Sequence, residues 1–445
     1  MLLHIGMDDT DSPNGGCTTH IAARLVERFL SVGVRFVDYP NLLRLNPNVP
    51  WKTRGNGAIC LRVEIDPSSE AVVKKTVLEE VEAFAEFTCG NTNPGVVFLN
   101  GGVPEEIIGF SSRVVRSVVT LDEALDLVDG WGGMAVGYKN MRGVIGALAA
   151  VGGLQRGDYT YEFLAYRNPQ RWGTPREVDP ASVRVMDGET EGDTFNNVDP
   201  KSARILIAPH GPDPVLFGVR GDDAQAVRRA GLMVSSEPVE RWAVFRTNQG
   251  TDAHLDVNSA IDTLRPNDPG VVEGQVAGPP RTIQGGHVIL RLRDRTAGID
   301  CAAYEPTGGF RDIVRGLIPG DLIRVYGGVR GDAPGEVLTF NLEKLEVLEL
   351  ADDVRLRNPS CPKCGGGMES MGRGKGFRCR KCGFRGRSLS KVEVKEERRI
   401  EEGLYITPPG AQRHLTKPLT RYGKERHGPA GPSLIEGWCS ALTAK

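Results

Sequence analysis

The chain opens with Met1-Leu2-Leu3-His4-Ile5-Gly6-Met7-Asp8-Asp9-Thr10-Asp11-Ser12-Pro13-Asn14-Gly15-Gly16-Cys17-Thr18-Thr19-His20. Residues Leu2 to Met7 are mostly apolar and predict a strand, and the apolar residues after His20 recur near the helical period, which predicts a helix. A strand, an acidic turn, a glycine pair and a helix in this order indicate an αβ unit whose turn binds a ligand.

Three carboxylates, those of Asp8, Asp9 and Asp11, fall within four positions. They repel one another at neutral pH unless a cation lies among them, and Mg²⁺ is the simplest candidate. If the strand continues, Asp9 and Asp11 point to one face and Asp8 to the other. We therefore expect these acids to hold a nucleoside triphosphate through Mg²⁺.

The glycines and threonines of the same stretch suit phosphate binding. Gly15 and Gly16 permit a close backbone turn, and Thr18 or Thr19 can cap a helix whose free N–H groups attract phosphate. The stretch lacks the Lys-Ser or Lys-Thr ending of a P-loop, so it is not a Walker motif. A turn that merely caps the helix is the alternative interpretation.

A second candidate element is the loop from Asn46 to Gly57, whose prolines and glycines exclude regular structure. Lys52 and Arg54 lie two residues apart in it and could both face an anion, which would complement the acidic cluster. The alternative is an exposed loop with solvated charges.

Composition places the chain among ordinary globular proteins, with 445 residues, 40% hydrophobic and 25% charged. We expect three or four domains, because single cores stop growing well below this length. The sequence shows neither an apolar run long enough to span a bilayer nor the pattern of a signal peptide. A cytoplasmic protein with no membrane partner is therefore expected.

Charge is distributed unevenly along the chain. Residues 354–445 hold 20 Lys and Arg against 8 Asp and Glu, so residues 1–353 carry a net charge of −14 within the chain total of −2. An acidic body followed by a basic region is typical of catalytic domains with a nucleic-acid-binding end.

Four of the nine cysteines form two pairs, Cys361-Pro-Lys-Cys364 and Cys379-Arg-Lys-Cys382. This spacing predicts a zinc ribbon in which four thiolates close a structural Zn²⁺ site and leave no position for catalysis. Basic residues between and within the pairs are expected to lie against phosphates.

The patterns of apolar residues predict a multidomain α+β chain. A ferredoxin-like layer is expected from strands around a few helices, and an OB-fold barrel from five strands with a helix between the third and fourth. OB-fold barrels bind single-stranded nucleic acid, although a structural barrel is the alternative. The expected parts are an αβ domain over residues 1–130, the ferredoxin-like domain over 131–255, the barrel over 265–350, the zinc ribbon over 358–385, and a charged helix (Arg385 to Glu402) with an extended basic arm over 386–445.

Four stretches carry a resemblance to a known family: Asp8 to Ser12, Asn46 to Gly57, Gly137-Tyr138-Lys139-Asn140-Met141-Arg142-Gly143, and Glu240 to Asp252. In these stretches, and in the barrel and ribbon that follow, the chain resembles the TiaS family, the archaeal tRNA agmatinylcytidine synthetases. The resemblance covers nearly the whole chain.

The resemblance implies an ATP-dependent ligase that joins agmatine to carbon 2 of the wobble cytidine in the CAU-anticodon isoleucine tRNA, so that the tRNA decodes AUA. It further implies a kinase-like first domain that cleaves ATP to AMP and phosphates and phosphorylates the cytidine oxygen, which agmatine then displaces as phosphate. It also implies a threonine that accepts phosphate itself, and the matching position is Thr18.

Agmatine needs a partner for its guanidinium, and the second domain offers three acids: Asp158, Glu162 and Asp199. We favour Asp199, because it ends a polar loop that could cover the ligand. Solvated surface charges are the alternative. The sequence predicts no oligomeric state.

Two other classes of function are compatible with parts of the chain. A non-catalytic RNA-binding adaptor would use the barrel and ribbon, and a metal-dependent nuclease would use the acidic cluster. The adaptor would not need three acids beside a glycine turn, and the nuclease would not need ATP.

Overall fold

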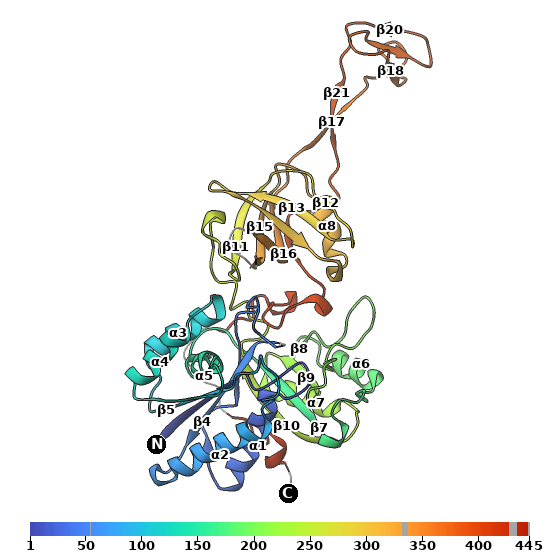
Figure 1. The fold of residues 1–445 in the computed structure, drawn as a ribbon. Coiled ribbons are helices and arrows are strands. Elements are labelled where there is room, and N and C mark those ends of the chain that lie inside the picture. Colours follow the sequence, from blue (N-terminus) through green and yellow to red (C-terminus); the bar gives the residue numbers. More distant parts are fainter. Residues whose placement is uncertain (54, 332–336, 427–433, 444–445) are drawn as a thin grey trace.

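The structure is a computed structural model that describes residues 1–53, 55–331, 337–426 and 434–443. Three bodies follow one another in space: a large αβ layer that contains the N-terminus, a barrel, and a small ribbon at the end of a two-stranded stalk (Figure 1). Among the described residues, no helix has the length and apolar character needed to cross a membrane.

One continuous ten-stranded sheet forms the αβ layer, in the order β6-β5-β1-β4-β3-β10-β7-β9-β8, with β2 beside β4. Its two halves join where β3 pairs with β10 in parallel; the other pairs are antiparallel. The strands are β1 (Leu2–Asp8), β2 (Arg35–Phe36), β3 (Asn41–Arg44), β4 (Gly57–Glu64), β5 (Gly95–Asn100), β6 (Met134–Gly137), β7 (Thr160–Arg167), β8 (Thr194–Phe195), β9 (Val215–Gly221) and β10 (Val239–Thr247).

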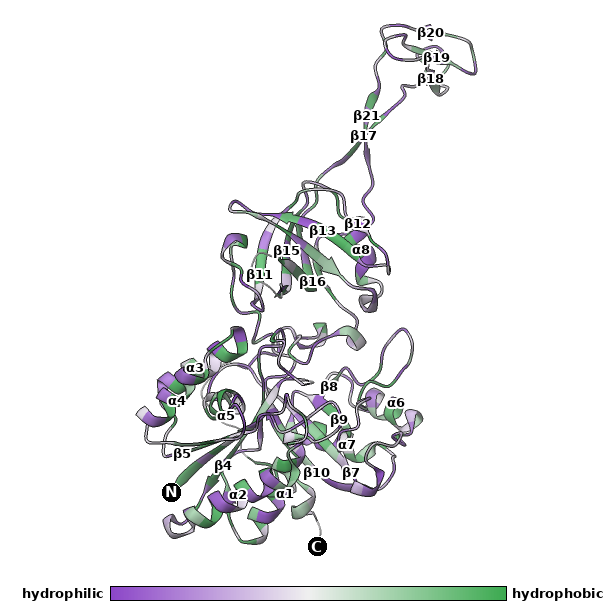
Figure 2. Cartoon of the chain, in the orientation of Figure 1, coloured by the Kyte–Doolittle hydropathy of each residue, from purple (hydrophilic) through white to green (hydrophobic). Residues whose placement is uncertain are grey.

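Seven helices cover this sheet unevenly, and their apolar sides face it (Figure 2). One core holds side chains of α1, α2, α6 and α7, so these helices share a face. A second core holds those of α3, α4 and α5, on the other face of the first half. The helices are α1 (Thr18–Ser31), α2 (Glu70–Phe84), α3 (Glu105–Arg116), α4 (Leu121–Gly130), α5 (Gly143–Gly152), α6 (Pro180–Glu189) and α7 (Ala224–Met233).

Strand alternation decides which side chains of β1 meet α5. Leu3, Ile5 and Met7 belong to the core with α1 and α2, which leaves Gly6 and Asp8 on the α5 face. An ideal Cβ on Gly6 would lie 2.1 Å from the carbonyl oxygen of Ala147. Glycine at this position therefore lets the helix backbone approach the strand that leads to the acidic cluster.

The barrel has five main strands in the order β11-β15-β16-β14-β13, and it closes because β11 also pairs with β13. The helix α8 lies between the third and fourth strands in the sequence, as predicted. A closed five-stranded barrel is thus confirmed. Its elements are β11 (Pro269–Val276), β12 (Arg281–Thr282), β13 (Val288–Arg293), β14 (Gly298–Ala303), α8 (Phe310–Gly316), β15 (Leu322–Arg330) and β16 (Thr339–Glu349), with β22 (Gly403–Ile406) added beside β16.

The stalk pairs β17 (Asp353–Arg357) with β21 (Val392–Glu396). It carries a three-stranded sheet of β18 (Met368–Ser370), β19 (Phe377–Cys379) and β20 (Arg385–Gly386). This arrangement overturns the charged helix that we expected from Arg385 to Glu402, because the segment supplies the returning strand of the stalk instead. Alternating valines with charged neighbours in Val392–Glu396 favour a strand.

Two further expectations differ from the structure. The expected unit boundary near Gly130 falls before β6 and α5, which pair with β5 and pack on β1 of the first half. The residues after β22 were expected to form an extended arm, but they run back across the sheet, where Leu415 and Trp438 are buried in its cores. Apolar residues spaced along the tail allow this docking.

Candidate active site

A cavity of about 860 Å³ lies on the α5 side of the sheet, beside the N-terminus of α5. Its floor includes residues of β1, β3, β7 and β9, and its walls include the Asn46–Gly57 loop and the tail residues Pro409, Gly410, Gln412 and His414. The second half of the sheet packs α6 and α7 into the core on the opposite side, so these strands are open toward the cavity.

All three predicted acids, Asp8, Asp9 and Asp11, line this cavity. The strand β1 ends at Asp8, and Asp9 has a φ of +57°, in the left-handed region. We expected Asp8 to alternate with Asp9 and Asp11 only if the strand continued, and it does not, because the backbone turns after Asp8. The turn brings the three carboxylates to one site.

Burial raises the pKa of Asp8 well above its usual value, and the charge of Asp9 raises it further. Burial also raises the pKa of Asp9, although the Arg142 guanidinium opposes this shift. Arg142 Nη2 donates to Asp9 Oδ2 at 2.8 Å. Burial and the neighbouring charge therefore both disfavour the ionised form of Asp8, and among the described residues only the four cysteines form a group of ligands gathered closely enough for a metal ion.

The helix α5 lies directly against the acidic cluster. An ideal Cβ on Gly146 would lie 1.9 Å from Asp8 Oδ2, and one on Gly143 would lie 2.8 Å from the Asp8 carbonyl oxygen. Glycine at position 146 therefore creates the space that the Asp8 carboxylate occupies, and glycine at position 143 makes room for the Asp8 backbone. The first backbone N–H groups of α5 donate within the chain, for example from Gly143 to the Asn93 carbonyl oxygen, so the helix N-terminus favours anions through its dipole alone.

The glycine turn forms as expected, but the threonines do not cap the helix. Gly16 has a φ of +72°, and Gly15 and Ser12 exchange backbone hydrogen bonds. The residue that caps α1 is Cys17, without a side-chain cap, so the predicted cap by Thr18 or Thr19 was wrong. Both threonines instead line the cavity, and Thr18 Oγ1 lies 2.9 Å from Thr10 Oγ1. The two hydroxyls share one hydrogen bond.

We expected Lys52 and Arg54 of the loop to supply positive charge beside the acidic cluster, but the structure shows a different arrangement. Lys52 lines the cavity, but its ammonium donates to the carbonyl oxygens of Pro47 and Val49 within its own loop. Arg54 lies outside the described residues. Among the described residues, the guanidinium of Arg142 contacts Asp9; Arg142 lies in the stretch Gly137 to Gly143, whose residues received no role from the sequence.

The other end of the cavity is built from Arg44, Glu162, Arg220 and His414. Arg220 Nε donates to Glu162 Oε1 at 3.0 Å, and Arg220 Nη2 donates to His414 Nδ1 at 3.0 Å. Gln249 donates to the second oxygen of Glu162. The charge of Arg44, together with burial and Arg220, lowers the pKa of His414 well below its usual value.

The three acids considered for agmatine occupy different environments. Glu162 lines the cavity. Asp158 does not line it and instead forms an ion pair with the buried Arg421. Asp199, which we favoured, also lies outside the lining, and its carboxylate accepts hydrogen bonds from the backbone of Lys201 and Ser202.

Sequence reasoning missed Arg44, Arg142, Arg220 and His414. Arg142 lies in a quoted motif and could have been matched to the acids by charge. Arg44, Arg220 and His414 come from β3, β9 and the tail, and no local pattern connects these segments.

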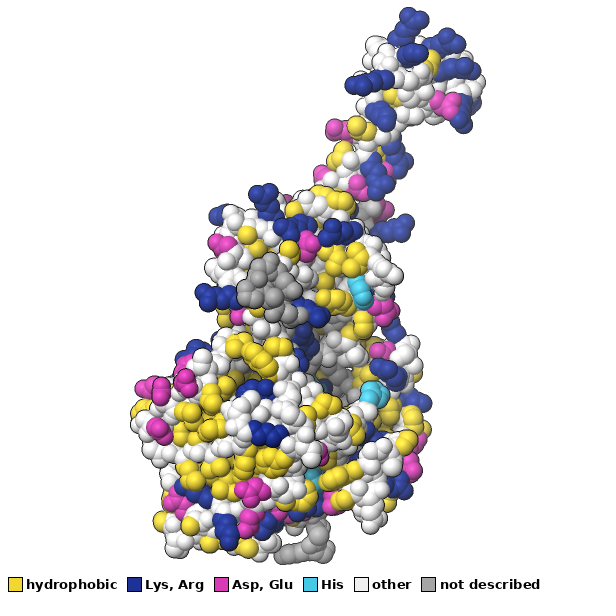
Figure 3. Space-filling model, in the orientation of Figure 1, with side chains coloured by type: hydrophobic (Ala, Val, Ile, Leu, Met, Phe, Trp, Pro, Cys, Tyr) yellow, Lys and Arg dark blue, Asp and Glu magenta, His cyan; other side chains and the backbone are white. Residues whose placement is uncertain are grey.

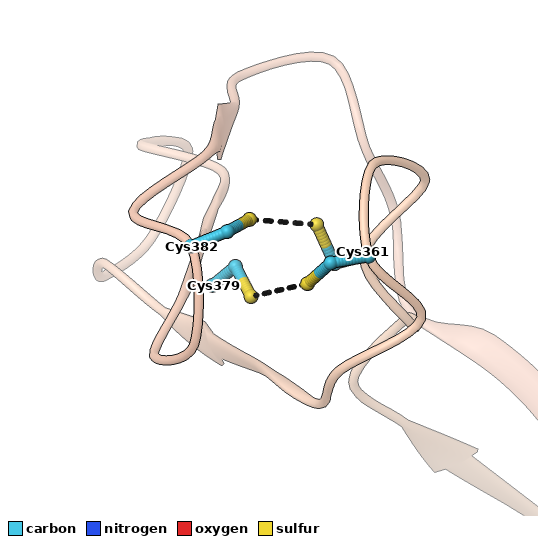
Figure 4. A group of neighbouring side chains, drawn as sticks. Cys361, Cys379 and Cys382 are labelled. Atoms are coloured by element: carbon cyan, nitrogen blue, oxygen red, sulfur yellow. Dashed lines mark hydrogen bonds between the residues drawn. The ribbon is translucent and has the colours of Figure 1, made fainter.

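The four predicted zinc ligands converge at the end of the stalk. The Sγ atoms of Cys361, Cys364, Cys379 and Cys382 lie within 4.8 Å of one another (Figure 4). This donor set fits one Zn²⁺, because four thiolates at such separations match a closed tetrahedral site. Lys and Arg side chains crowd the surface of the ribbon and stalk (Figure 3).

Family comparisons match three parts of the chain. Residues 4–140 match the TiaS TCKD domain, residues 141–254 the TiaS FLD domain, and residues 358–400 the TiaS C-terminal zinc ribbon domain.

Individual relatives match over nearly the full length. The isoleucine-tRNA 2-agmatinylcytidine synthetase TiaS of Methanosarcina mazei is 45% identical, over 94% of this chain and 97% of the relative. The enzyme of the same name from Pyrococcus horikoshii is also 45% identical, with the same coverage.

Solved structures give the same result. A crystal structure of apo TiaS has a TM-score of 0.85 and 40% identity, covering 95% of this chain and 98% of that one. A complex of TiaS with its isoleucine tRNA, AMPCPP and agmatine has a TM-score of 0.83 and 37% identity, covering 95% and 97%. The chain belongs to the TiaS family.

Proposed function

We propose that this protein is an isoleucine-tRNA 2-agmatinylcytidine synthetase, which uses ATP to join agmatine to carbon 2 of the wobble cytidine of the CAU-anticodon isoleucine tRNA. Relatives that carry this name match nearly the whole chain. The observation that carries the proposal is the shared cavity in which Asp8, Asp9, Asp11 and Thr18 face Glu162 and Arg220.

The acidic end of the cavity is the proposed site of the ATP phosphates. Asp8, Asp9 and Asp11 would hold Mg²⁺, which supplies charge neutralisation of the triphosphate and its leaving group. The raised pKa of Asp8 is compatible with this role, because a bound cation would offset both the cost of burying its charge and the repulsion from Asp9. Arg142 and the first turn of α5 provide the remaining positive potential for phosphate oxygens.

Phosphoryl transfer activates the cytidine. Its carbonyl oxygen is a poor leaving group, whereas phosphate leaves readily once an amine attacks carbon 2. Thr18, which lines the cavity in the first turn of α1, is the proposed residue that accepts phosphate itself. The base has to leave the anticodon stack to reach this site.

Agmatine is assigned to the Glu162 end of the cavity. Of the three acids considered, Glu162 lines the cavity, whereas Asp158 is held by Arg421 and Asp199 accepts hydrogen bonds from its own turn. Lys52 forms part of the cavity wall, and Gly15 and Gly16 shape the turn that holds the acids.

We also propose a finer fold for each half of the sheet. The second half of the sheet runs β7-α6-β8-β9-α7-β10, with strands in the order β10-β7-β9-β8, which supports a ferredoxin-like βαββαβ arrangement. The first half is proposed to be kinase-like in activity. The barrel and the basic ribbon would hold the body of the tRNA in the cytoplasm, where tRNA acts.

Labelled agmatine, ATP, Mg²⁺ and tRNA provide the test. We expect the wild-type enzyme to transfer label to the CAU-anticodon isoleucine tRNA. A methionine tRNA with a CAU anticodon, which does not receive agmatine, should stay unlabelled. The Asp8→Asn enzyme should label neither tRNA. Intact unlabelled tRNA would indicate an RNA-binding adaptor, and cleaved tRNA without ATP would indicate a nuclease; either result contradicts the proposal.

A further inference from the structure

Three nitrogen-bearing side chains, Arg44, Arg220 and His414, line the cavity beside Glu162, and we call them the basic cluster. They come from β3, from β9 and from the tail that returns after the barrel. The proposed phosphate and agmatine sites give them no role in binding. Their hydrogen bonds and charges point to a specific kind of ligand.

Positive charge exceeds negative charge at this end of the cavity. Glu162 accepts from both Arg220 and Gln249, so its two oxygens are engaged within the protein. Arg44 Nη1 donates to the carbonyl oxygen of Gly55 at 3.3 Å, and its Nε is buried with no hydrogen-bond partner among the described residues. The hydrogen bond from Nη1 is long, and Arg44 lines the cavity, so a ligand oxygen there can accept from this guanidinium.

His414 adds a second available donor without adding charge. Arginine nitrogens only donate, so His414 Nδ1 must accept from Arg220 Nη2, and the ring proton then resides on Nε2. The charges of Arg44 and Arg220 and burial lower the pKa of His414 well below its usual value. The imidazole is therefore a neutral N–H donor near pH 7, and its Nε2 lies at the Gly55 wall, 3.1 Å from an ideal Cβ there.

Arg44 lies between the two ends of the cavity. Burial lowers the pKa of Arg44 to about 10, and the charges of Glu162 and Arg220 on one side and of Cys17 and Asp11 on the other also act on it.

We propose that Arg44, Arg220 and His414 form a binding site for phosphate oxygens, which receives the phosphate that the amine displaces from the activated cytidine. This inference rests on the proposed function. In that step the C2–N bond forms and the C2–O bond breaks; the oxygen and its bonding pair leave with the phosphate, and a proton of the amine passes to the departing phosphate. Guanidinium and imidazole N–H groups stabilise the charge that grows on that oxygen.

A backbone phosphodiester of the tRNA offers the same oxygens and is the second source that the experiment has to separate. The two guanidiniums of the basic cluster favour an anion among themselves, so the agmatine assigned to this end of the cavity would contact Glu162 and not the cluster.

The first experiment measures inorganic phosphate binding to the full-length protein by titration calorimetry. We expect Arg44→Gln and His414→Ala to weaken phosphate binding by at least about tenfold, as expected for loss of a directed donor. His414→Gln keeps an amide N–H and should recover most of the affinity. Arg156→Gln, which removes an exposed arginine paired with Glu105 far from these contacts, is the matched control and should bind as the wild type does.

The second experiment separates the two sources in single turnovers. The tRNA is first activated with ATP, and labelled agmatine is then added. A slower amine step with unchanged tRNA affinity assigns the cluster to the displaced phosphate; a raised tRNA KM with an unchanged amine step assigns it to a backbone phosphate.

The phosphate site would be overturned if both Arg44→Gln and His414→Ala matched the wild type in phosphate affinity, in the rate of the amine step and in the KM for tRNA. Failure of the wild-type protein to incorporate agmatine would instead contradict the proposed function, and the calorimetric result would still decide the phosphate site on its own.

Discussion

Asp8 lies where it does because the facing residue on α5 is a glycine. Its carboxylate oxygen occupies the space that a Cβ on Gly146 would fill, at 1.9 Å. The backbone of α5 and the end of β1 are rigid parts of one packed layer, so neither can yield without disturbing the core. The position of this carboxylate thus depends on a residue far away in the sequence.

Gly146→Ala should therefore displace the Asp8 carboxylate and lower ATP turnover by about a hundredfold, the cost of moving a catalytic group by roughly 1 Å. Steady-state ATP cleavage in the presence of tRNA measures the effect. Gly109→Ala in α3 is the control, because an ideal Cβ there has no neighbour within 4 Å. Equal turnover in the two variants would show that Asp8 is not needed at that position.

His4 gives a prediction about pH. Arg62 Nη1 donates to His4 Nδ1 at 2.7 Å, so Nε2 carries the proton toward the carbonyl oxygen of Gly101. Burial, with the charge of Arg62, lowers the pKa of His4 to about 4. The unfolded chain therefore binds a proton below pH 6.5 that the folded chain takes up only near pH 4.

Stability should accordingly be complete above about pH 6.5 and fall between about pH 6.5 and 4, by on the order of 3 kcal/mol from this residue. Urea unfolding at several pH values measures it. His4→Gln cannot titrate, so its stability should fall less steeply over the same interval. Parallel pH curves for the two proteins would refute the assignment.

At the scale of elements, the tail after β22 holds the barrel, the cavity and the sheet together. Lys344 of β16 contacts Asp252 and the Lys417 carbonyl oxygen, and its side chain is fully buried. Further along, Arg421 donates to Asp158 and Asp222 of the sheet layer. Between these anchors, Pro409 to His414 line the cavity.

Arg421→Gln should lower the free energy of unfolding of the sheet layer by about 3–5 kcal/mol, because it leaves Asp158 and Asp222 without their buried partner. Hydrogen exchange should also rise in the segment Pro409 to Thr416. Arg315→Gln removes an exposed i,i+3 pair and serves as the control, for which about 0–1 kcal/mol is expected. If hydrogen exchange in Pro409 to Thr416 stays as slow as in the wild type, Arg421 does not anchor the tail.

The contrast between local and distant features explains what the sequence could predict. The helix after the acidic turn, the five barrel strands and the cysteine pairs depend on short periods or spacings, and they were recognised. The tail was misread because its docking depends on pairs such as Asp158 and Arg421, 263 residues apart. The contacts of the basic cluster are equally remote, so its role could not be inferred from any one segment.

At the scale of the molecule, the cavity proposed for the chemistry and the ribbon proposed to bind tRNA lie in different places. The cysteine cluster stands at the end of the stalk, on the far side of the barrel from the sheet layer (Figure 1), whose strands β1, β3, β7 and β9 contribute to the cavity. Zinc should therefore act on tRNA binding and leave the cavity intact.

Metal analysis should return about one zinc per chain, as expected for a four-thiolate site. Cys364→Ser should lose the metal and weaken tRNA binding, while ATP binding in the absence of tRNA stays as in the wild type. A protein without zinc after growth in zinc-replete medium, or a zinc-free variant with unchanged tRNA affinity, would contradict this account.

We propose that the protein activates the wobble cytidine by phosphorylating the oxygen on carbon 2 of the base, and that attack by the agmatine amine then removes this oxygen as phosphate. The most direct measurement uses tRNA with ¹⁸O at the carbon 2 oxygen of the wobble cytidine, followed by mass spectrometry of the released products. We expect ¹⁸O to appear in inorganic phosphate, in an amount equal to the agmatine incorporated into the tRNA. Label in AMP, or label retained in the modified tRNA, would contradict it.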